Sequence, residues 1–172
     1  MPIMIRPMIR VTALLSCLLL AGCGFTPLYG EAGQSAGVTQ TLAAVDVGPV
    51  PDRLGQVVRN SLVNRMAPRG SAQAAAYRLD LTLDRSVEGY GFEEDASITR
   101  ENLRLVASYR LTDLNRGAVV LEGVARANAA YDVVQSDYAT FSATQDAERR
   151  TADAVVEEIH TRLALYFRAN GR

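Results

Sequence analysis

Cys23 is the residue of this chain best placed to undergo chemistry, because it ends the short sequence L-A-G-C. An apolar run over residues 11–20 leads into this sequence and follows Arg6 and Arg10. A cationic start, about ten apolar residues and small residues before a cleavage point are typical of an export signal. A cysteine thiolate is a strong nucleophile that a lipid donor can alkylate. The pattern predicts a lipoprotein signal peptide over residues 1–22 and a lipid-modified Cys23.

The predicted modification is a covalent lipid, with an N-acyl chain and an S-diacylglycerol group on Cys23. Each buried methylene contributes about 0.8 kcal/mol, so several acyl chains hold a protein firmly at a membrane. The apolar run itself is too short to span a bilayer, which needs about twenty apolar residues. Gly24 follows the cysteine, and lipoproteins without Asp at that position generally move to the outer membrane. We therefore expect a lipid-anchored protein on the periplasmic side of the outer membrane; an ordinary export signal with an incidental cysteine is the alternative.

The composition of the mature chain indicates a single domain without disulfides. Removal of the signal leaves about 150 residues, an ordinary size for one domain with its own core. The two cysteines are Cys17 and Cys23, so neither a disulfide nor a thiolate zinc site can form within the domain. Every one of the 18 Lys+Arg residues is Arg. Loss of the two in the signal leaves a net charge of about −3, which gives no basic excess for nucleic-acid binding.

The mature chain divides into a tether and a folded domain. Residues 23–41 are rich in Gly, Ser and Gln, and this composition predicts a flexible, lipidated tether. Within the domain, residues 42–172, alternating apolar and polar residues predict strands over 42–50, 77–84, 103–111 and 118–131. Apolar residues at helical spacing predict helices over 52–66, with Asp52 as the N-cap, and over 144–169.

These elements predict an α+β fold with the order β-α-β-β-β-α. Strands that alternate between apolar and polar residues have one covered face and one exposed face, as antiparallel sheets often do. Two amphipathic helices are enough to cover the apolar face. We therefore expect a two-layer sandwich, in which two helices pack on one face of a four-stranded, mainly antiparallel sheet.

Three features could be mistaken for catalytic or metal sites. Residues 33–37 match the G-x-S-x-G pattern of serine hydrolases, but they lie in the tether and not at a turn between a strand and a helix. The one histidine, His160, falls in the middle of the last predicted helix, where a surface or boundary role is expected. The acidic run at 93–95 has the composition of a solvated loop. We expect no enzyme activity, no metal site and no cofactor apart from the lipid.

Four arginines are predicted to share the polar face of the sheet. On the last three strands the odd-numbered residues are the apolar set, so the opposite face carries Arg78, Arg104, Arg110 and Arg126. Acidic residues are interspersed among them at positions 80, 84 and 122. One interpretation is a wet surface with cross-strand ion pairs, each of which contributes little. The other is a face that binds anions or a partner, because guanidinium groups suit phosphate and carboxylate.

Four stretches of the sequence resemble the LPS-assembly lipoprotein family LptE, in the form found in alphaproteobacteria. The most specific stretch is C-G-F-T-P-L-Y at 23–29, directly after the signal. The others lie at 98–103, 109–111 and 162–167. Together they cover essentially the whole mature chain. The resemblance implies the family fold, in which two helices pack on a four-stranded sheet.

The resemblance also implies a function without catalysis. Members of the LptE family plug the lumen of the β-barrel LptD, help it assemble, and take part in lipopolysaccharide transport to the cell surface. Basic residues of the family bind lipopolysaccharide, and in this chain arginine must serve that role. Arg100 lies in a family-like stretch and is the first expected contact; Arg104, Arg110 and Arg126 follow from their shared face. The alternative is a general envelope lipoprotein that is a scaffold or binding module for another protein.

Overall fold

A computed structural model describes residues 34–67, 74–91 and 99–170 of the chain. The predicted signal peptide, Cys23 and the tether up to residue 33 lie outside the described residues, as do the acids at 93–95. The elements follow in the order α2 (Gln34–Ala43), β1 (Val45–Val47), α3 (Asp52–Met66), β2 (Tyr77–Gly89), β3 (Arg100–Asp113), β4 (Ala118–Asp132) and α4 (Asp137–Asn170). None of the helices in these ranges is long and apolar enough to cross a membrane.

The four strands form one mixed sheet in the order β1-β2-β3-β4. The pairs β2–β3 and β3–β4 are antiparallel, but β1 runs parallel to β2, with Val45 opposite Tyr77. The prediction of an α+β fold is confirmed, whereas the prediction of a mainly antiparallel sheet is wrong. The reason lies in α3, which connects β1 to β2: a crossover through a helix returns the chain to the same end of the sheet and makes the two strands parallel.

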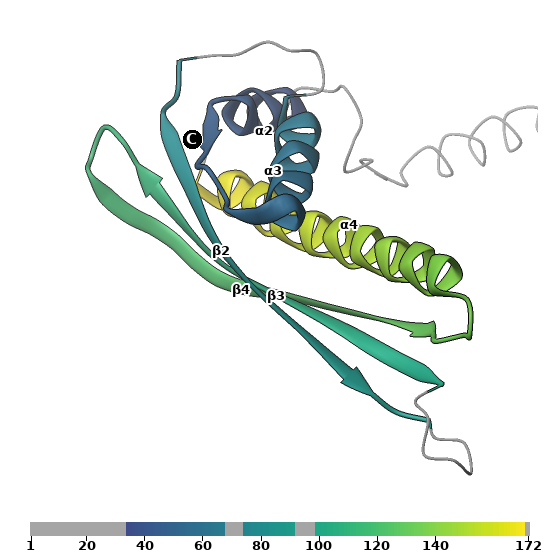
Figure 1. Ribbon diagram of the computed structural model, residues 1–172. Helices are drawn as coiled ribbons and strands as arrows, with labels where there is room; N and C mark the ends of the chain where they lie inside the picture. The colour runs from purple at the N-terminus through teal and green to yellow at the C-terminus, as the bar shows by residue number, and fades with distance from the viewer. Residues whose placement is uncertain (1–33, 68–73, 92–98, 171–172) are drawn as a thin grey trace, which may run out of the picture. The chain divides into compact units, whose positions relative to one another are not determined.

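Helices α3 and α4 lie on the same side of the sheet (Figure 1). Helix α4 packs along β4 and β3, and α3 packs against α4 and β1. The core between the layers is made by the odd-numbered strand residues and the predicted stripe of α4, among them Leu79, Leu103, Leu105, Leu111, Val155, Ile159 and Leu163. All of these side chains are fully buried. The faces inferred from strand alternation and from helical spacing are therefore confirmed.

The order of elements is α-β-α-β-β-β-α, because a helix also forms in the predicted tether. Helix α2 occupies Gln34–Ala43, and β1 is correspondingly shorter than the strand predicted over 42–50. The last helix starts at Asp137, two turns before the predicted start at 144. In these added turns Tyr138 and Phe141 are largely exposed, and the buried residues of α4 begin only at Ala147.

The start of α3 differs from the predicted capping arrangement. Pro51 occupies the N-cap position, and no side chain caps the helix there. Asp52 is the first helical residue and has a φ of 66°, in the left-handed region that Asp tolerates better than most residues. The Gln56 side chain instead donates a hydrogen bond to the Val50 carbonyl at 2.8 Å. The prediction that Asp52 is the N-cap is therefore wrong, although the helix limits are correct.

Candidate functional site

The predicted arginine face exists, and it is the side of the sheet that the helices leave open. The side chains of Arg78, Arg104, Arg110 and Arg126 are all exposed. Their odd-numbered neighbours, such as Leu79 and Leu105, are buried against the helices. A strand turns successive side chains to opposite faces, so the arginines project away from the core. We call this surface the open face.

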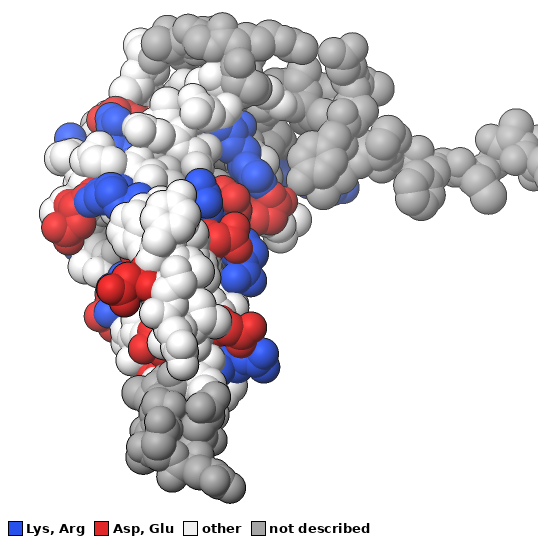
Figure 2. All heavy atoms as spheres, turned by 45° about the vertical axis from the view of Figure 1, so that its right-hand side comes forward, with Lys and Arg blue, Asp and Glu red and all other residues white. Residues whose placement is uncertain are grey.

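Three arginines on the open face are neutralised by carboxylates on the same surface. The Arg110 Nε lies 2.7 Å from a Glu122 oxygen, in a direct cross-strand pair. The Arg100 Nε lies 2.8 Å from an Asp132 oxygen, and this hydrogen bond raises the pKa of Arg100. Figure 2 shows the same pattern more widely, since basic and acidic atoms lie beside one another on the surface in view.

The third neutralised arginine is Arg78, whose Nε lies 3.0 Å from an Asp80 oxygen. These two residues lie two positions apart on β2 and project from the same face. The hydrogen bond raises the pKa of Arg78. Exposed pairs of this kind add little stability, but each reduces the charge that an incoming anion meets. The interpretation of the open face as a surface with ion pairs thus holds for Arg78, Arg100 and Arg110.

Arg104 and Arg126 differ from the other three arginines of the open face, because neither guanidinium forms an ion pair with another residue in the part of the chain that the structure describes. Strand register places Arg104 opposite Asn128 and Arg126 opposite Val106. The two arginines therefore occupy diagonal positions on β3 and β4. Such neighbours lie about 7–8 Å apart at their backbones, within reach of one ligand for side chains of this length.

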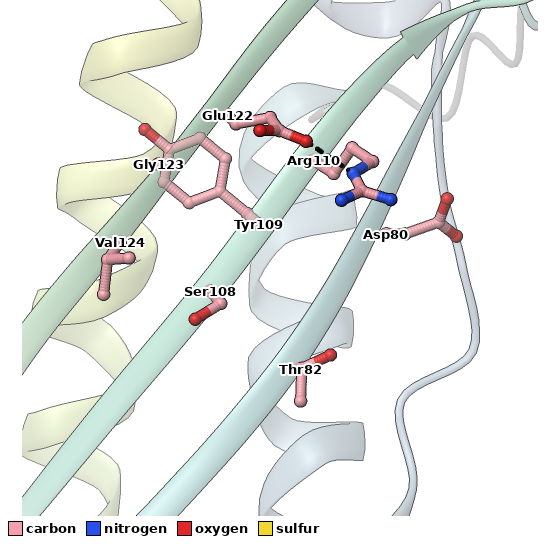
Figure 3. Close-up of a pocket in the computed structure, with 8 residues that line it drawn as sticks. All are labelled: Asp80, Thr82, Ser108, Tyr109, Arg110, Glu122, Gly123 and Val124. Carbon is pink, nitrogen blue, oxygen red and sulfur yellow. Dashed lines mark hydrogen bonds and ion pairs between the residues drawn. The ribbon is translucent and has the colours of Figure 1, made fainter. Parts of the chain in front are cut away.

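A shallow hollow lies on the open face, around Arg110, Thr82 and Ser108 (Figure 3). Arg110 lies between Asp80 and Glu122 in one row, and the hydroxyls of Thr82 and Ser108 form the next row. Hydroxyls and guanidinium groups are hydrogen-bond donors, whereas the two carboxylates accept. This mixture of donors and acceptors suits the binding of a polar or anionic group.

His160 is the residue that a catalytic interpretation would need, and it faces the helix layer. Its side chain is buried, and its Nδ1 has no hydrogen-bond partner among the described residues. Burial, with a smaller contribution from the charge of Arg65, lowers the pKa of His160. The described residues contain no group of three or more His, Cys, Asp or Glu side chains that could hold a metal ion. His160 is thus a buried residue of α4 whose ring lies near enough to Arg65 of α3 to feel its charge.

Sequence reasoning ranked Arg100 first and missed its partner. Asp132 is the last residue of β4, and it is paired with Arg100 because these two positions are opposite in the register. A register cannot be read from alternation alone, since alternation fixes the face and not the pairing. The structure therefore favours Arg104 and Arg126 over Arg100 and Arg110 as candidate anion-binding residues.

Comparisons with known proteins bear on the whole domain. The family model for LptE, lipopolysaccharide-assembly, matches residues 39–163. An uncharacterized protein from Rickettsia prowazekii (strain Madrid E) is 24% identical over 151 residues, which cover 88% of this chain and 92% of that protein. A crystal structure from Caulobacter crescentus CB15, assigned as a candidate lipoprotein, aligns with a TM-score of 0.65 and 27% identity, over 79% of this chain and 98% of that one.

A more distant structure has the same fold. The minor lipoprotein from Acinetobacter baumannii aligns with a TM-score of 0.55 and 15% identity, over 70% of this chain and 90% of its own. The family match over residues 39–163 spans every strand of the sheet and both helices that cover it, except for the last turns of α4. This protein belongs to the LptE family of lipopolysaccharide-assembly proteins.

Proposed function

We propose that this protein is an outer-membrane lipoprotein that plugs the LptD β-barrel, helps the barrel assemble, and takes part in lipopolysaccharide transport to the cell surface. The observation that carries the proposal is the match to the lipopolysaccharide-assembly family over residues 39–163. The lipoprotein assignments of the neighbours from Caulobacter and Acinetobacter support the envelope location. The sequence L-A-G-C supports a lipid anchor at Cys23.

Within this function, Arg104 and Arg126 are the proposed contacts to the acidic groups of lipopolysaccharide. Phosphate accepts charge-assisted hydrogen bonds from guanidinium forks, often two from one fork. A guanidinium that is already bonded to a carboxylate must give up that bond before it can bind an anion. Arg104 and Arg126 have no such bond to break among the described residues, whereas Arg100 and Arg110 do. The latter two are therefore secondary contacts.

The test of these contacts is a double charge reversal, Arg104→Glu with Arg126→Glu. We expect weaker binding of purified lipopolysaccharide and a smaller dependence of binding on salt, because two phosphate contacts are lost. The matched control is Arg149→Glu with Arg168→Glu, two exposed arginines of α4 without an ion pair in the described part of the chain. An equal loss of lipopolysaccharide binding in both double variants would show that only the net charge matters. Unchanged binding in both would exclude Arg104 and Arg126 as contacts.

The barrel function needs a separate test. Depletion of the protein should lower the amount of correctly assembled LptD and make the outer membrane more permeable. Cys23→Ser should leave an unprocessed precursor without lipid, which mass spectrometry of the N-terminus measures. Normal LptD assembly after complete depletion would exclude the barrel function and leave a scaffold for another envelope protein.

A further inference from the structure

The two edges of the sheet differ in how their outward backbone groups are satisfied. Along β4, three charged side chains of α4 bond to the backbone of the edge. Arg162 donates to the Val124 carbonyl at 3.1 Å, and Arg150 donates to the Ala130 carbonyl at 3.2 Å. Between them, a Glu158 oxygen accepts the Arg126 backbone N–H at 3.0 Å. These bonds satisfy one outward backbone group at each of three β4 residues and place α4 side chains against this part of the edge, which hinders its pairing with another strand.

At the opposite edge of the sheet, β1 covers only the first residues of β2. β1 pairs with Tyr77–Leu79 of β2, and the Gly48 N–H adds a bond to the Leu79 carbonyl at 2.9 Å. Beyond Leu79, β2 continues to Gly89 while β1 has ended. No helix or strand of the described residues runs along the outer side of this part of β2 (Figure 1). Ten further residues of β2 thus extend past the end of the neighbouring strand.

The direction of the free backbone groups follows from the hydrogen bonds at the two ends of β2. The backbone groups of Tyr77 and Leu79 point to β1, whereas the Tyr90 N–H points to β3, where it donates to the Arg100 carbonyl at 2.8 Å. Strand geometry alternates, so the odd-numbered residues after Leu79 also point outward. These are Leu81, Leu83, Arg85, Val87 and Gly89. Within the described part of the chain, no hydrogen bond satisfies their outward N–H and C=O groups.

We propose that the β2 edge over residues 81–89 accepts an additional strand from a second polypeptide. A free edge of this length, about 30 Å, presents backbone donors and acceptors at the spacing that an extended chain matches. The inference is independent of the arginine contacts on the open face and of the identity of the barrel. It assigns to this edge a binding site for an extended polypeptide segment.

The side chains beside the edge define the chemistry of that segment. On the open face, Asp84 and Glu88 have no ion pair within the described residues, so basic residues on the added strand would complement them. On the helix side, Leu83 is partly buried and Val87 is 38% exposed, so apolar residues would extend the core there. The partner segment therefore alternates between basic and apolar residues, in keeping with the two-residue period of a strand.

The test uses the full chain, purified in detergent, and the synthetic peptide acetyl-T-K-V-K-V-K-T-amide as the probe. Amide hydrogen exchange is followed residue by residue by NMR. The peptide should slow exchange at Leu83, Arg85 and Val87 by about tenfold or more, because their N–H groups gain acceptors. The Arg126 amide, which Glu158 already bonds, should not change. A peptide with Glu in place of Lys should give no protection.

A proline substitution tests whether the backbone carries the binding. Val87→Pro removes an outward N–H and leaves the β2–β3 hydrogen bonds in place, so an edge strand should tolerate it. We expect affinity for the lysine peptide to fall by about tenfold, because a peptide carbonyl loses its donor. The matched variant Val87→Thr keeps the N–H and should bind within about threefold of the unmodified chain. If Val87→Pro unfolds, the exchange measurement on the unmodified chain still decides.

Three results would overturn the inference. Slow exchange at Leu83, Arg85 and Val87 before the peptide is added would mean that the edge is already covered by this chain or by a second copy. Equal binding of the lysine and glutamate peptides would exclude the charge complementarity of Asp84 and Glu88. Equal peptide affinity in folded Val87→Pro and Val87→Thr would exclude backbone pairing.

Discussion

The ring of Tyr109 lies directly over Gly123, its partner on the neighbouring strand. A β-carbon added at Gly123 would lie 2.6 Å from the Tyr109 Cζ, far inside normal contact distance. The ring can therefore cross β4 and reach the region of Arg162, and the hydrogen bond with Tyr109 raises the pKa of Arg162. An aromatic side chain thus covers the bare backbone of a glycine on an edge strand, an arrangement that stabilises sheet edges.

Gly123→Ala should destabilise the protein by about 1–3 kcal/mol, because the Tyr109 ring must move. Denaturation in urea measures the change. The control is Gly37→Ala, where an added β-carbon meets nothing within 4 Å and should give at most about 1 kcal/mol of stabilisation within α2. In a Tyr109→Leu background the cost of Gly123→Ala should shrink, and an unchanged cost would show that the ring is not its cause.

Alanine substitutions in α4 should lower the free energy of unfolding at buried positions and hardly change it at exposed ones. Ile159 is fully buried, so Ile159→Ala should lower the free energy of unfolding by about 2–5 kcal/mol. Leu165 is 53% exposed, and Leu165→Ala should change the free energy of unfolding by less than about 0.5 kcal/mol. Thermal or urea unfolding compares the two. Similar losses in both variants would mean that Leu165 is covered in solution by something else.

His160 should make stability depend on pH in a defined direction. The unfolded chain binds a proton near the ordinary histidine pKa of 6.5, whereas burial and Arg65 lower the pKa in the folded protein. Between these two values the unfolded state binds more protons, so the free energy of unfolding falls as the pH drops through about 6.5 and is insensitive to this group well above it. His160→Gln should flatten the curve between about pH 7.5 and 5.5. Parallel curves for the two proteins would contradict the lowered pKa.

Glu158→Ala should reopen the edge of β4. The substitution frees the Arg126 N–H and removes the ion pair of Glu158 with Arg162. We expect a loss of about 1 kcal/mol and concentration-dependent self-association through the freed edge. Sedimentation velocity measures the association. Asp153→Ala, an exposed acid on the same helix, is the control and should remain as monomeric as the unmodified chain.

The sequence predicted which face of the sheet each side chain lies on, but it did not predict which strands run parallel or which charged residues pair. Alternation on the long strands correctly separated Leu105 and Leu111 from Arg104 and Arg110, because burial follows the two-residue period directly. It did not predict the parallel pairing of β1, which depends on the path of α3, or the pairing of Arg100 with Asp132, which depends on register. It also did not predict the first turns of α4, where Tyr138 and Phe141 are exposed and the buried residues of the helix, which begin at Ala147, have not yet started.

The closure of the β4 edge has a consequence for the order in which the protein can be completed. All three side chains that bond to this edge belong to α4, which follows β4 in the chain. A nascent chain that ends before Asp137 would therefore hold its three long strands with both sheet edges open. Such intermediates are prone to aggregate or to be degraded, and chaperones bind them. Synthesis and release of the last helix is thus the step that covers the β4 edge, while the β2 edge over residues 81–89 stays free.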